Sequence, residues 1–246
     1  GNLTSATDPL SKTTTYTYDE PGRMTKLYHP ANPTTAIMTN VYDSLGRIKE
    51  QKDANLNTWT YYFAGPRSEE VNPVGKNRVL YFNHRGQPVK DVNSLGEVIL
   101  TEYDGLGRRS KVTYPEGNSE EYTYDAAGNV LSFRRKAKSG SGLSDLVQTF
   151  TYDSTWNKVK TEVDALGRTT TYNYDSTKGN LLSIQKPAVG GSTPTVSYTY
   201  NTRGQVLTRT DETGVVRKFN YHSSTEVLLS MVDDDSGLDL TTVYTY

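Results

Sequence analysis

The chain has 246 residues, with 34% hydrophobic residues, 11% aromatic residues and a net charge of −1. It is too rich in aromatic residues for a disordered protein, and its mean hydropathy of −0.69 is too low for a protein with one thick core. The absence of cysteine excludes disulfides and thiolate metal sites, and no apolar run approaches the roughly 18 residues of a membrane-spanning helix.

The clearest local pattern lies between Tyr122 and Leu131, where the sequence reads Y-T-Y-D-A-A-G-N-V-L. Two tyrosines two residues apart lie on the same face of a β-strand. Asp125 can accept backbone N–H hydrogen bonds and start a turn. Gly128 follows at the position where a three-residue hairpin loop requires φ > 0. The stretch therefore predicts a strand, a tight turn and a returning strand.

This unit recurs along the whole chain, so it is a structural repeat. The ten steps from Tyr18 to Tyr246 cover 228 residues, or about 23 residues per repeat. The pattern is weakest around Tyr61-Tyr62-Phe63. The other copies begin at Tyr16, Tyr42, Tyr81, Tyr103, Tyr122, Tyr152, Tyr172, Tyr198 and Phe219.

A second turn lies midway in each repeat, as in Asn93-Ser94-Leu95-Gly96. β-Branched residues and tyrosine dominate between the turns, and no stretch has the 3.6-residue periodicity of a helix. The sequence predicts an all-β fold of antiparallel hairpin repeats in one spiralling sheet, with strands of seven to nine residues. The turn residues expected to define it are Asp19, Gly22, Asp43, Gly46, Asp104, Gly107, Asp125, Gly128, Asp164, Gly167 and Gly204.

Three insertions interrupt the repeat without shifting its phase: residues 29–35, 136–145 and 186–194. Surface hairpin tips tolerate such insertions, so we expect extended tips and no domain boundary. Residues 1–246 are predicted to be a single array of ten to eleven repeats. Because the first residues, Gly1-Asn2-Leu3, match the middle of a repeat, the array is expected to be a section of a larger shell.

The recurring Tyr-Asp-x-x-Gly-Arg/Asn pattern resembles the YD or Rhs (rearrangement hotspot) repeat over essentially all 246 residues. Members of that family include Rhs toxins, the BC components of insecticidal toxin complexes and teneurins. The resemblance implies a β-sheet shell that encloses a C-terminal toxin domain. The D-P-x-G-containing protease signature that usually closes the shell is missing here, since Asp8-Pro9-Leu10-Ser11 lacks the glycine.

The resemblance implies a secreted or cell-surface structural protein, exported from bacteria, that encapsulates a cargo or toxin polypeptide. Its expected partners are the cargo domain of the parent protein and flanking YD repeats. The alternative is a teneurin-like adhesion or glycan-binding module. The nearly neutral charge gives no sign of nucleic-acid or membrane binding. No enzyme motif is found, and no catalytic, cofactor or metal residue is predicted.

Several polar residues are candidate sites, but turn positions explain the histidines and the acidic run. His29, His84 and His222 lie in or beside turns without a metal-ligand spacing, so solvated turn histidines are favoured. The acidic run 233–239 departs from the EF-hand pattern, and a solvated turn is favoured over a calcium loop. The arginines after the turn glycines are expected to pair with acids on the next strand; they are Arg23, Arg47, Arg108 and Arg168. Asn2-Leu3-Thr4 is a formal glycosylation sequon.

The terminal strands, placed by the sequence at Thr13–Tyr18 and Leu240–Tyr246, carry no charge that would discourage strand pairing. Unpaired sheet edges attract other edges, and repeat arrays without capping units tend to associate. We therefore expect the isolated segment to associate end to end.

Overall fold

The computed structural model describes residues 1–234 and 239–246. The chain is all-β: its described residues form 22 strands and contain no helix. They divide into two compact units, Gly1–Ser119 and Glu120–Tyr246, which are described separately here. The prediction of an all-β protein built from antiparallel hairpins is therefore confirmed.

Unit 1 contains eleven complete strands and the first residue of a twelfth. The strands are β1 (Ser5–Thr7), β2 (Thr13–Tyr18), β3 (Met24–His29), β4 (Asn32–Tyr42), β5 (Ile48–Asp53), β6 (Thr58–Ala64), β7 (Arg67–Val71), β8 (Asn77–Phe82), β9 (Pro88–Val92), β10 (Val98–Tyr103) and β11 (Arg109–Thr113). From β1 to β10, each strand pairs antiparallel with the next strand in the chain.

Unit 2 repeats the same arrangement. Its strands are β12 (Ser119–Tyr124), whose first residue belongs to unit 1, β13 (Val130–Lys136), β14 (Leu146–Tyr152), β15 (Val159–Val163), β16 (Thr169–Tyr174), β17 (Leu181–Gln185), β18 (Thr195–Tyr200), β19 (Val206–Thr210), β20 (Val216–Tyr221), β21 (Leu228–Asp234) and β22 (Leu240–Val243). From β13 onward, each strand pairs antiparallel with its successor.

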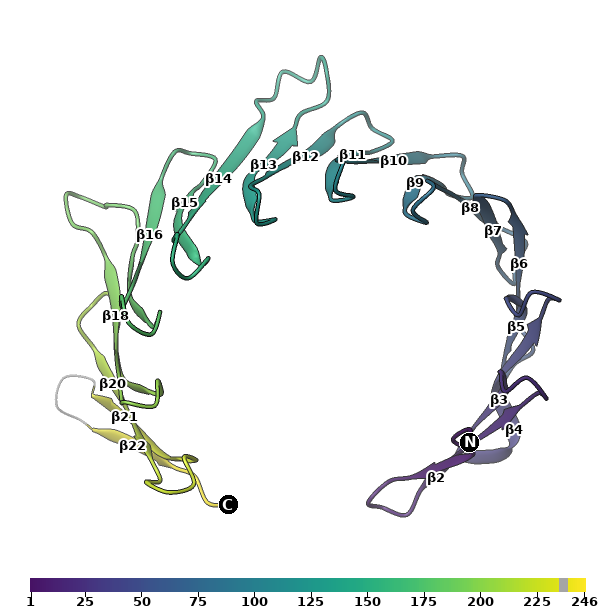
Figure 1. Ribbon diagram of the computed structural model, residues 1–246, viewed down its shortest axis with the longest axis horizontal. Coiled ribbons are helices and arrows are strands. Elements are labelled where there is room, and N and C mark those ends of the chain that lie inside the picture. Colours follow the sequence, from purple (N-terminus) through teal and green to yellow (C-terminus); the bar gives the residue numbers. More distant parts are fainter. Residues whose placement is uncertain (235–238) are drawn as a thin grey trace. The chain divides into compact units, whose positions relative to one another are not determined.

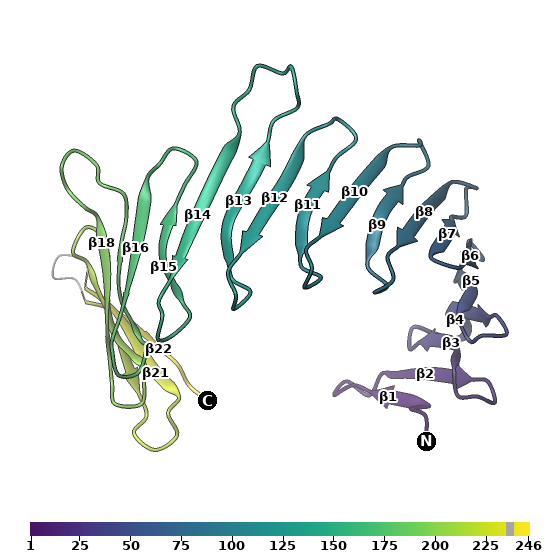
Figure 2. The same cartoon turned by 45° about the horizontal axis from the view of Figure 1, so that its top comes forward.

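Within each unit the turns alternate between the two edges of the sheet (Figures 1 and 2). The turns that follow the Tyr-x-Tyr-Asp pattern, here called YD turns, lie on one edge. The turns midway in each repeat, here called second turns, lie on the other edge. The insertions at residues 29–35, 136–145 and 186–194 lie at hairpin tips on the second-turn edge, as predicted.

The strands are shorter than predicted. All have five to seven residues except β1 and β22, which are shorter, and β4, which has 11. The reason is that most YD hairpins carry a β-bulge beside the turn, as between Asn173 and Tyr174. A bulge disrupts the ladder and ends regular pairing early. A second correction concerns the N-terminal edge, because β1 pairs with β2 and β2 is therefore not the outer strand.

The glycine positions follow the turn prediction. Gly46, Gly107, Gly128 and Gly167 have φ between 76° and 94°, in the left-handed region that glycine adopts without strain. Three YD turns are one residue longer than the others. In these turns the carbonyl of the first turn residue accepts a hydrogen bond from the amide four residues later, and in the others from the amide three residues later. In the three longer turns the left-handed residue is Asn157, Gly179 or Glu226.

The molecule has a very thin core. Among the described residues, the buried hydrophobic side chains are Val112 and Val196, at 5% and 3% exposure. The two faces of unit 2 differ in chemistry. Register places Tyr172, Tyr174 and Ile184 on an aromatic face, and Thr171, Asn173 and Ser183 on the opposite, hydroxyl-rich face.

Candidate functional site

The repeated contacts between neighbouring hairpins are the main candidate for function, because they form a continuous sheet without a thick core. The first element is the turn aspartate. Asp104 Oδ1 accepts backbone N–H bonds from Leu106 and Arg108, each 2.9 Å long. Its Oδ2 accepts a bond of 2.7 Å from Arg108 Nε. One carboxylate thus satisfies the turn amides and fixes the side chain that leaves the turn.

The same ion pair forms between the first and last residues of the turns at Asp19, Asp43 and Asp164. This corrects the prediction that Arg23, Arg47, Arg108 and Arg168 pair with acids on the next strand. The physical reason is the tight turn, which brings residues i and i+4 together so that the guanidinium reaches the turn carboxylate locally.

These hydrogen bonds stabilise the charged form of the turn aspartates. The side-chain hydrogen bond from the arginine lowers the pKa of Asp19 and of Asp164 below 3.8. In Asp175, the backbone N–H of Lys178 makes the largest contribution and lowers the pKa to about 2. All three carboxylates are solvent-accessible, so their role is local turn geometry.

The second element is a line of contacts between successive YD turns within each unit, here called the turn ladder. In unit 1, Gln87 Nε2 donates a 2.7 Å hydrogen bond to the Gly107 carbonyl, and Arg85 Nη2 donates one of 2.9 Å to the Gly105 carbonyl. In unit 2, Lys158 Nζ donates to the Gly179 carbonyl at 2.7 Å. These turns are therefore attached to the turn one repeat further along.

Side chains of a neighbouring YD turn lie close to two of the turn glycines. A Cβ at Gly179 would lie 2.6 Å from Cδ2 of Trp156, which comes from the preceding YD turn. A Cβ at Gly107 would lie 2.8 Å from Arg85 Nη1. Gly179 is therefore needed for positive φ and also for close packing by a rigid ring of the neighbouring turn, whereas at Gly107 the flexible end of the Arg85 side chain can move away.

The third element is a set of tyrosine–carbonyl hydrogen bonds on the aromatic face. The tyrosine immediately before the turn donates its hydroxyl hydrogen to a backbone carbonyl of the preceding repeat. Tyr174 bonds to Val159 O at 2.7 Å, where the preceding returning strand begins. Equivalent bonds of 2.6–3.0 Å are made by Tyr18, Tyr42, Tyr103, Tyr152, Tyr200 and Tyr246.

Cation–π contacts add to these bonds in unit 1. The Arg23 guanidinium lies 4.6 Å from the centre of the Tyr42 ring, one repeat further on. The Arg47 guanidinium lies 4.4 Å from the Phe63 ring. The turn arginine therefore binds its own aspartate and also contacts the next aromatic residue.

The hydroxyl-rich face of unit 2 has its own pattern. In all five of its YD hairpins, two short polar side chains hydrogen-bond across the strands at the same distance from the turn. Their separations are 2.6–3.0 Å, in the pairs Thr123–Ser132, Thr151–Thr161, Asn173–Ser183, Thr199–Thr208 and Asn220–Ser230. From β14 to β19, the paired positions on this face carry no charged residue.

The remaining sequence candidates lie apart from one another. His29 and His222 accept backbone N–H bonds through Nδ1 inside their own turns, and His84 lies in the turn after β8. The described residues hold no group of three or more His, Cys, Asp or Glu side chains placed to bind a metal. The acidic run 233–239 includes residues 235–238, which lie outside the described residues. The Asn2 sequon precedes β1 and is exposed.

The sequence showed the turn aspartates and glycines but not the contacts between repeats. The signal for the tyrosine bonds was present, because the tyrosine before the aspartate recurs in most copies. The signal for the turn ladder was weaker. Its hydrogen-bond donors include arginine, glutamine and lysine, a tryptophan ring packs against one glycine, and these side chains come from different positions in the turn.

Comparison with known proteins finds a repeat family that matches part of the chain. Residues 1–34 and 103–139 match the family described as RHS Repeat. The chain is 28% identical over 194 residues to double-stranded DNA deaminase toxin A of Burkholderia cenocepacia, covering 79% of this chain and 12% of that protein. It is 29% identical over 185 residues to the tRNA3(Ser)-specific nuclease WapA of Bacillus spizizenii, covering 63% of this chain and 8% of that protein.

The chain therefore spans only about a tenth of the length of these relatives. Among solved structures, TcdB2-TccC3 is similar, with a TM-score of 0.45 and 16% identity over 96% of this chain and 18% of that chain. The similarity to TcdB2-TccC3 without its hypervariable C-terminal region has a TM-score of 0.44 and also 16% identity, over 95% and 17% of the two chains. In the part of the chain that the structure describes, no helix is long and apolar enough to cross a membrane.

Proposed function

Because residues 1–34 and 103–139 match the RHS repeat family, we propose that the chain is a section of a shell wall that encloses a cargo polypeptide in a secreted toxin-type protein. The chain is assigned a structural function. Any chemical activity would belong to the enclosed segment. The observation that carries this proposal is the single-layer sheet, whose repeats bind one another through the turn ladder and the tyrosine–carbonyl bonds.

A wall of this kind must hold its shape without support from a packed second layer. The tyrosine–carbonyl bonds attach the aromatic face of most repeats to the repeat before, and the turn ladder attaches YD turns along one edge. Because each contact involves only neighbouring repeats, the sheet can be extended by adding repeats. This is the property that a large enclosing surface requires.

The mechanism is steric exclusion. A continuous antiparallel sheet satisfies the backbone hydrogen bonds of its inner strands and leaves no gap for another chain to pass between them. The cargo is kept from proteases and from premature folding partners because they cannot reach it. The partial relatives are named as a deaminase toxin and a nuclease, and a toxic cargo of that general kind would require such isolation.

Site-specific photo-cross-linking in the longer gene product tests the proposal. Thr170 and Thr171 are neighbours on β16, but their side chains lie on opposite faces of the sheet, because Thr170 pairs with Glu162 and Thr171 with Thr161. A wall has an inside and an outside. A photo-reactive residue should therefore cross-link to cargo from one of these two positions and not from the other.

Two results would refute the proposal. Cross-links to cargo from neither position would show that the sheet does not enclose it. Equal cross-linking from both positions would show that cargo reaches both faces, as in an unclosed or misfolded assembly. Circular dichroism of each variant provides the folding control.

A further inference from the structure

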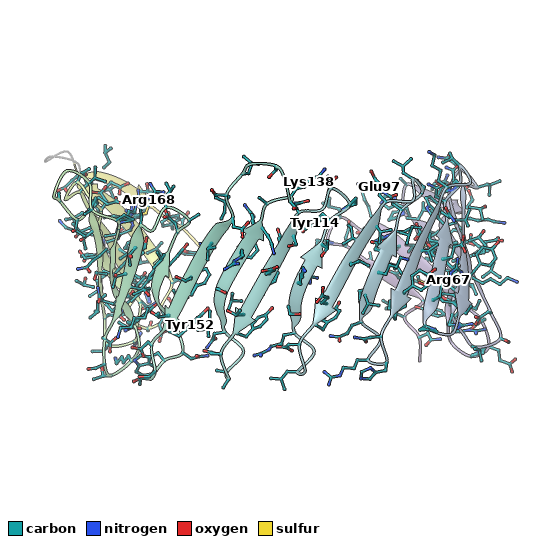
Figure 3. The ribbon with its side chains drawn as sticks, turned by 90° about the horizontal axis from the view of Figure 1, so that it is seen from above. Arg67, Glu97, Tyr114, Lys138, Tyr152 and Arg168 are labelled. Carbon is teal, nitrogen blue, oxygen red and sulfur yellow. The ribbon has the colours of Figure 1, made fainter. Side chains whose placement is uncertain are left out.

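A groove in unit 1 combines apolar walls with two carboxylates. Its volume is about 540 Å³, within the range of ligand pockets in proteins. It lies where the second turns 93–97 and 114–118 meet strands β10 and β11. Leu100 and Thr113 are direct partners across these strands. Figure 3 shows Glu97 and Tyr114, both of which line the groove, at the second-turn edge of this unit.

The apolar part of the groove is well exposed to solvent. Leu95, at the tip of its turn, is 73% exposed, and Leu100 is 43% exposed. Pro115 extends this surface from the neighbouring turn. An apolar surface of this kind is stabilised when a partner's methylene or methyl groups cover it.

The polar part of the groove is negatively charged. Glu97 and Glu116 are among its lining residues, and no lysine or arginine is. Glu97 accepts one hydrogen bond, 2.6 Å long, from Asn93 Nδ2. Glu116 forms no hydrogen bond or ion pair with any described residue. The nearest cation by strand register is Lys90, opposite Leu100, and its ammonium lies 5.4 Å from the centre of the Tyr81 ring.

From this combination we propose that the groove binds a lysine or arginine side chain of a partner polypeptide. Such a side chain has an apolar stem and a cationic head. The stem would cover Leu95, Leu100 and Pro115, and the head would lie between the two carboxylates. A neutral or acidic peptide would leave both charges unpaired, so charge complementarity selects the basic partner. The proposal does not depend on the shell function.

A titration with short peptides tests this site, using the 246-residue chain with Thr242→Lys, a charge on the outer strand β22 that reduces association. The probe is a Gly/Ser peptide with Leu-Lys-Leu at its centre, and its control has Leu-Glu-Leu instead. In two-dimensional amide NMR spectra, the lysine peptide should shift signals of residues 95–100 and 113–116, and the glutamate peptide should not. Added salt should weaken binding, because exposed ion pairs are screened.

Variants separate the charged and apolar contributions. The double variant Glu97→Gln, Glu116→Gln should weaken binding about fivefold or more. Leu95→Ser should also weaken it, and the exposed position of Leu95 in a turn leaves the fold intact. The matched control is Glu212→Gln, which alters a second-turn carboxylate that pairs with Lys186 in unit 2; binding should be unchanged.

Three results would overturn the proposal. They are no shifts with the lysine peptide at millimolar concentration, equal binding of the glutamate peptide, and an affinity that the double variant leaves unchanged. Shifts confined to other parts of the chain would also reject this groove as the site.

Discussion

Single residues determine the geometry of each turn in this protein. The aspartate accepts the turn amides, the glycine supplies positive φ, and the last turn residue contacts the next repeat. These three roles explain the Asp-x-x-Gly-Arg spacing without any catalytic requirement. They also make separate predictions for the carboxylates and for the glycines.

The lowered pKa values of the turn aspartates predict how the stability of the folded chain depends on pH. Their pKa values are lower in the folded chain than the ordinary value of 3.8, reaching about 2 for Asp175. A group whose pKa is depressed by folding contributes stability above its unfolded pKa and loses it as pH falls through the folded value. The urea midpoint should therefore be steady above about pH 5 and fall between about pH 4 and 2.

The variant Asp175→Asn cannot ionise and should show a smaller fall over the same range. Urea unfolding followed by tryptophan fluorescence at a series of pH values measures both curves. A midpoint that stays constant from pH 5 to pH 2 in the native chain would show that the aspartates do not support the fold.

The turn glycines fall into two classes, which should differ in how much substitution by alanine destabilises the fold. Gly167→Ala should cost about 1–2 kcal/mol from left-handed strain alone, since a Cβ there meets no atom within 4 Å. Gly179→Ala should cost about 1–3 kcal/mol more, because the added Cβ overlaps Trp156. Unfolding free energies from urea titrations give this comparison.

A double-mutant cycle identifies the cause of the extra cost. In the Trp156→Ala background, Gly179→Ala should cost no more than Gly167→Ala, because the overlapping ring has been removed. If Gly179→Ala costs the same with and without the tryptophan, the close packing of the two turns is not what makes Gly179 necessary.

At the level of the strands and hairpins, the tyrosine–carbonyl bonds hold most hairpins to the hairpin before. Tyr174→Phe removes the hydroxyl that bonds to Val159 O, and should destabilise the chain by about 0.5–1.5 kcal/mol. Tyr198→Phe is the matched control, because the Tyr198 hydroxyl makes no hydrogen bond with the described residues. Chemical denaturation of both variants tests the difference, and equal stabilities would contradict the role assigned to these bonds.

The strands, their order and the turn glycines could be predicted from the sequence, because period 2 and turn chemistry are local signals. The contacts between repeats could not. Sequence spacing places Tyr174 before its turn but does not give the register that brings its hydroxyl to Val159. The predicted ion-pair partner of Arg108, an acid on the next strand, was wrong for a related reason. The tight turn places the Arg108 guanidinium beside the Asp104 carboxylate.

The whole chain has two outer strands whose residues are all exposed, β1 and β22. Neither contains a charged residue, so nothing discourages edge-to-edge pairing. In light scattering across a concentration series, the isolated 246-residue chain should associate. Thr242→Lys, which places a charge on β22, should reduce association. A strictly monomeric chain at high concentration would contradict this prediction.

The central claim is that this sheet encloses another polypeptide, and protease protection tests it most directly. The longer gene product that contains this chain would be digested under native conditions, and cargo cleavage followed by mass spectrometry. A matched sample would be digested after its turns are weakened by Gly179→Ala and Tyr174→Phe. The account predicts that cargo resists cleavage in the native shell and is cleaved when the wall is weakened. Cargo that is cleaved equally fast in both samples would contradict it.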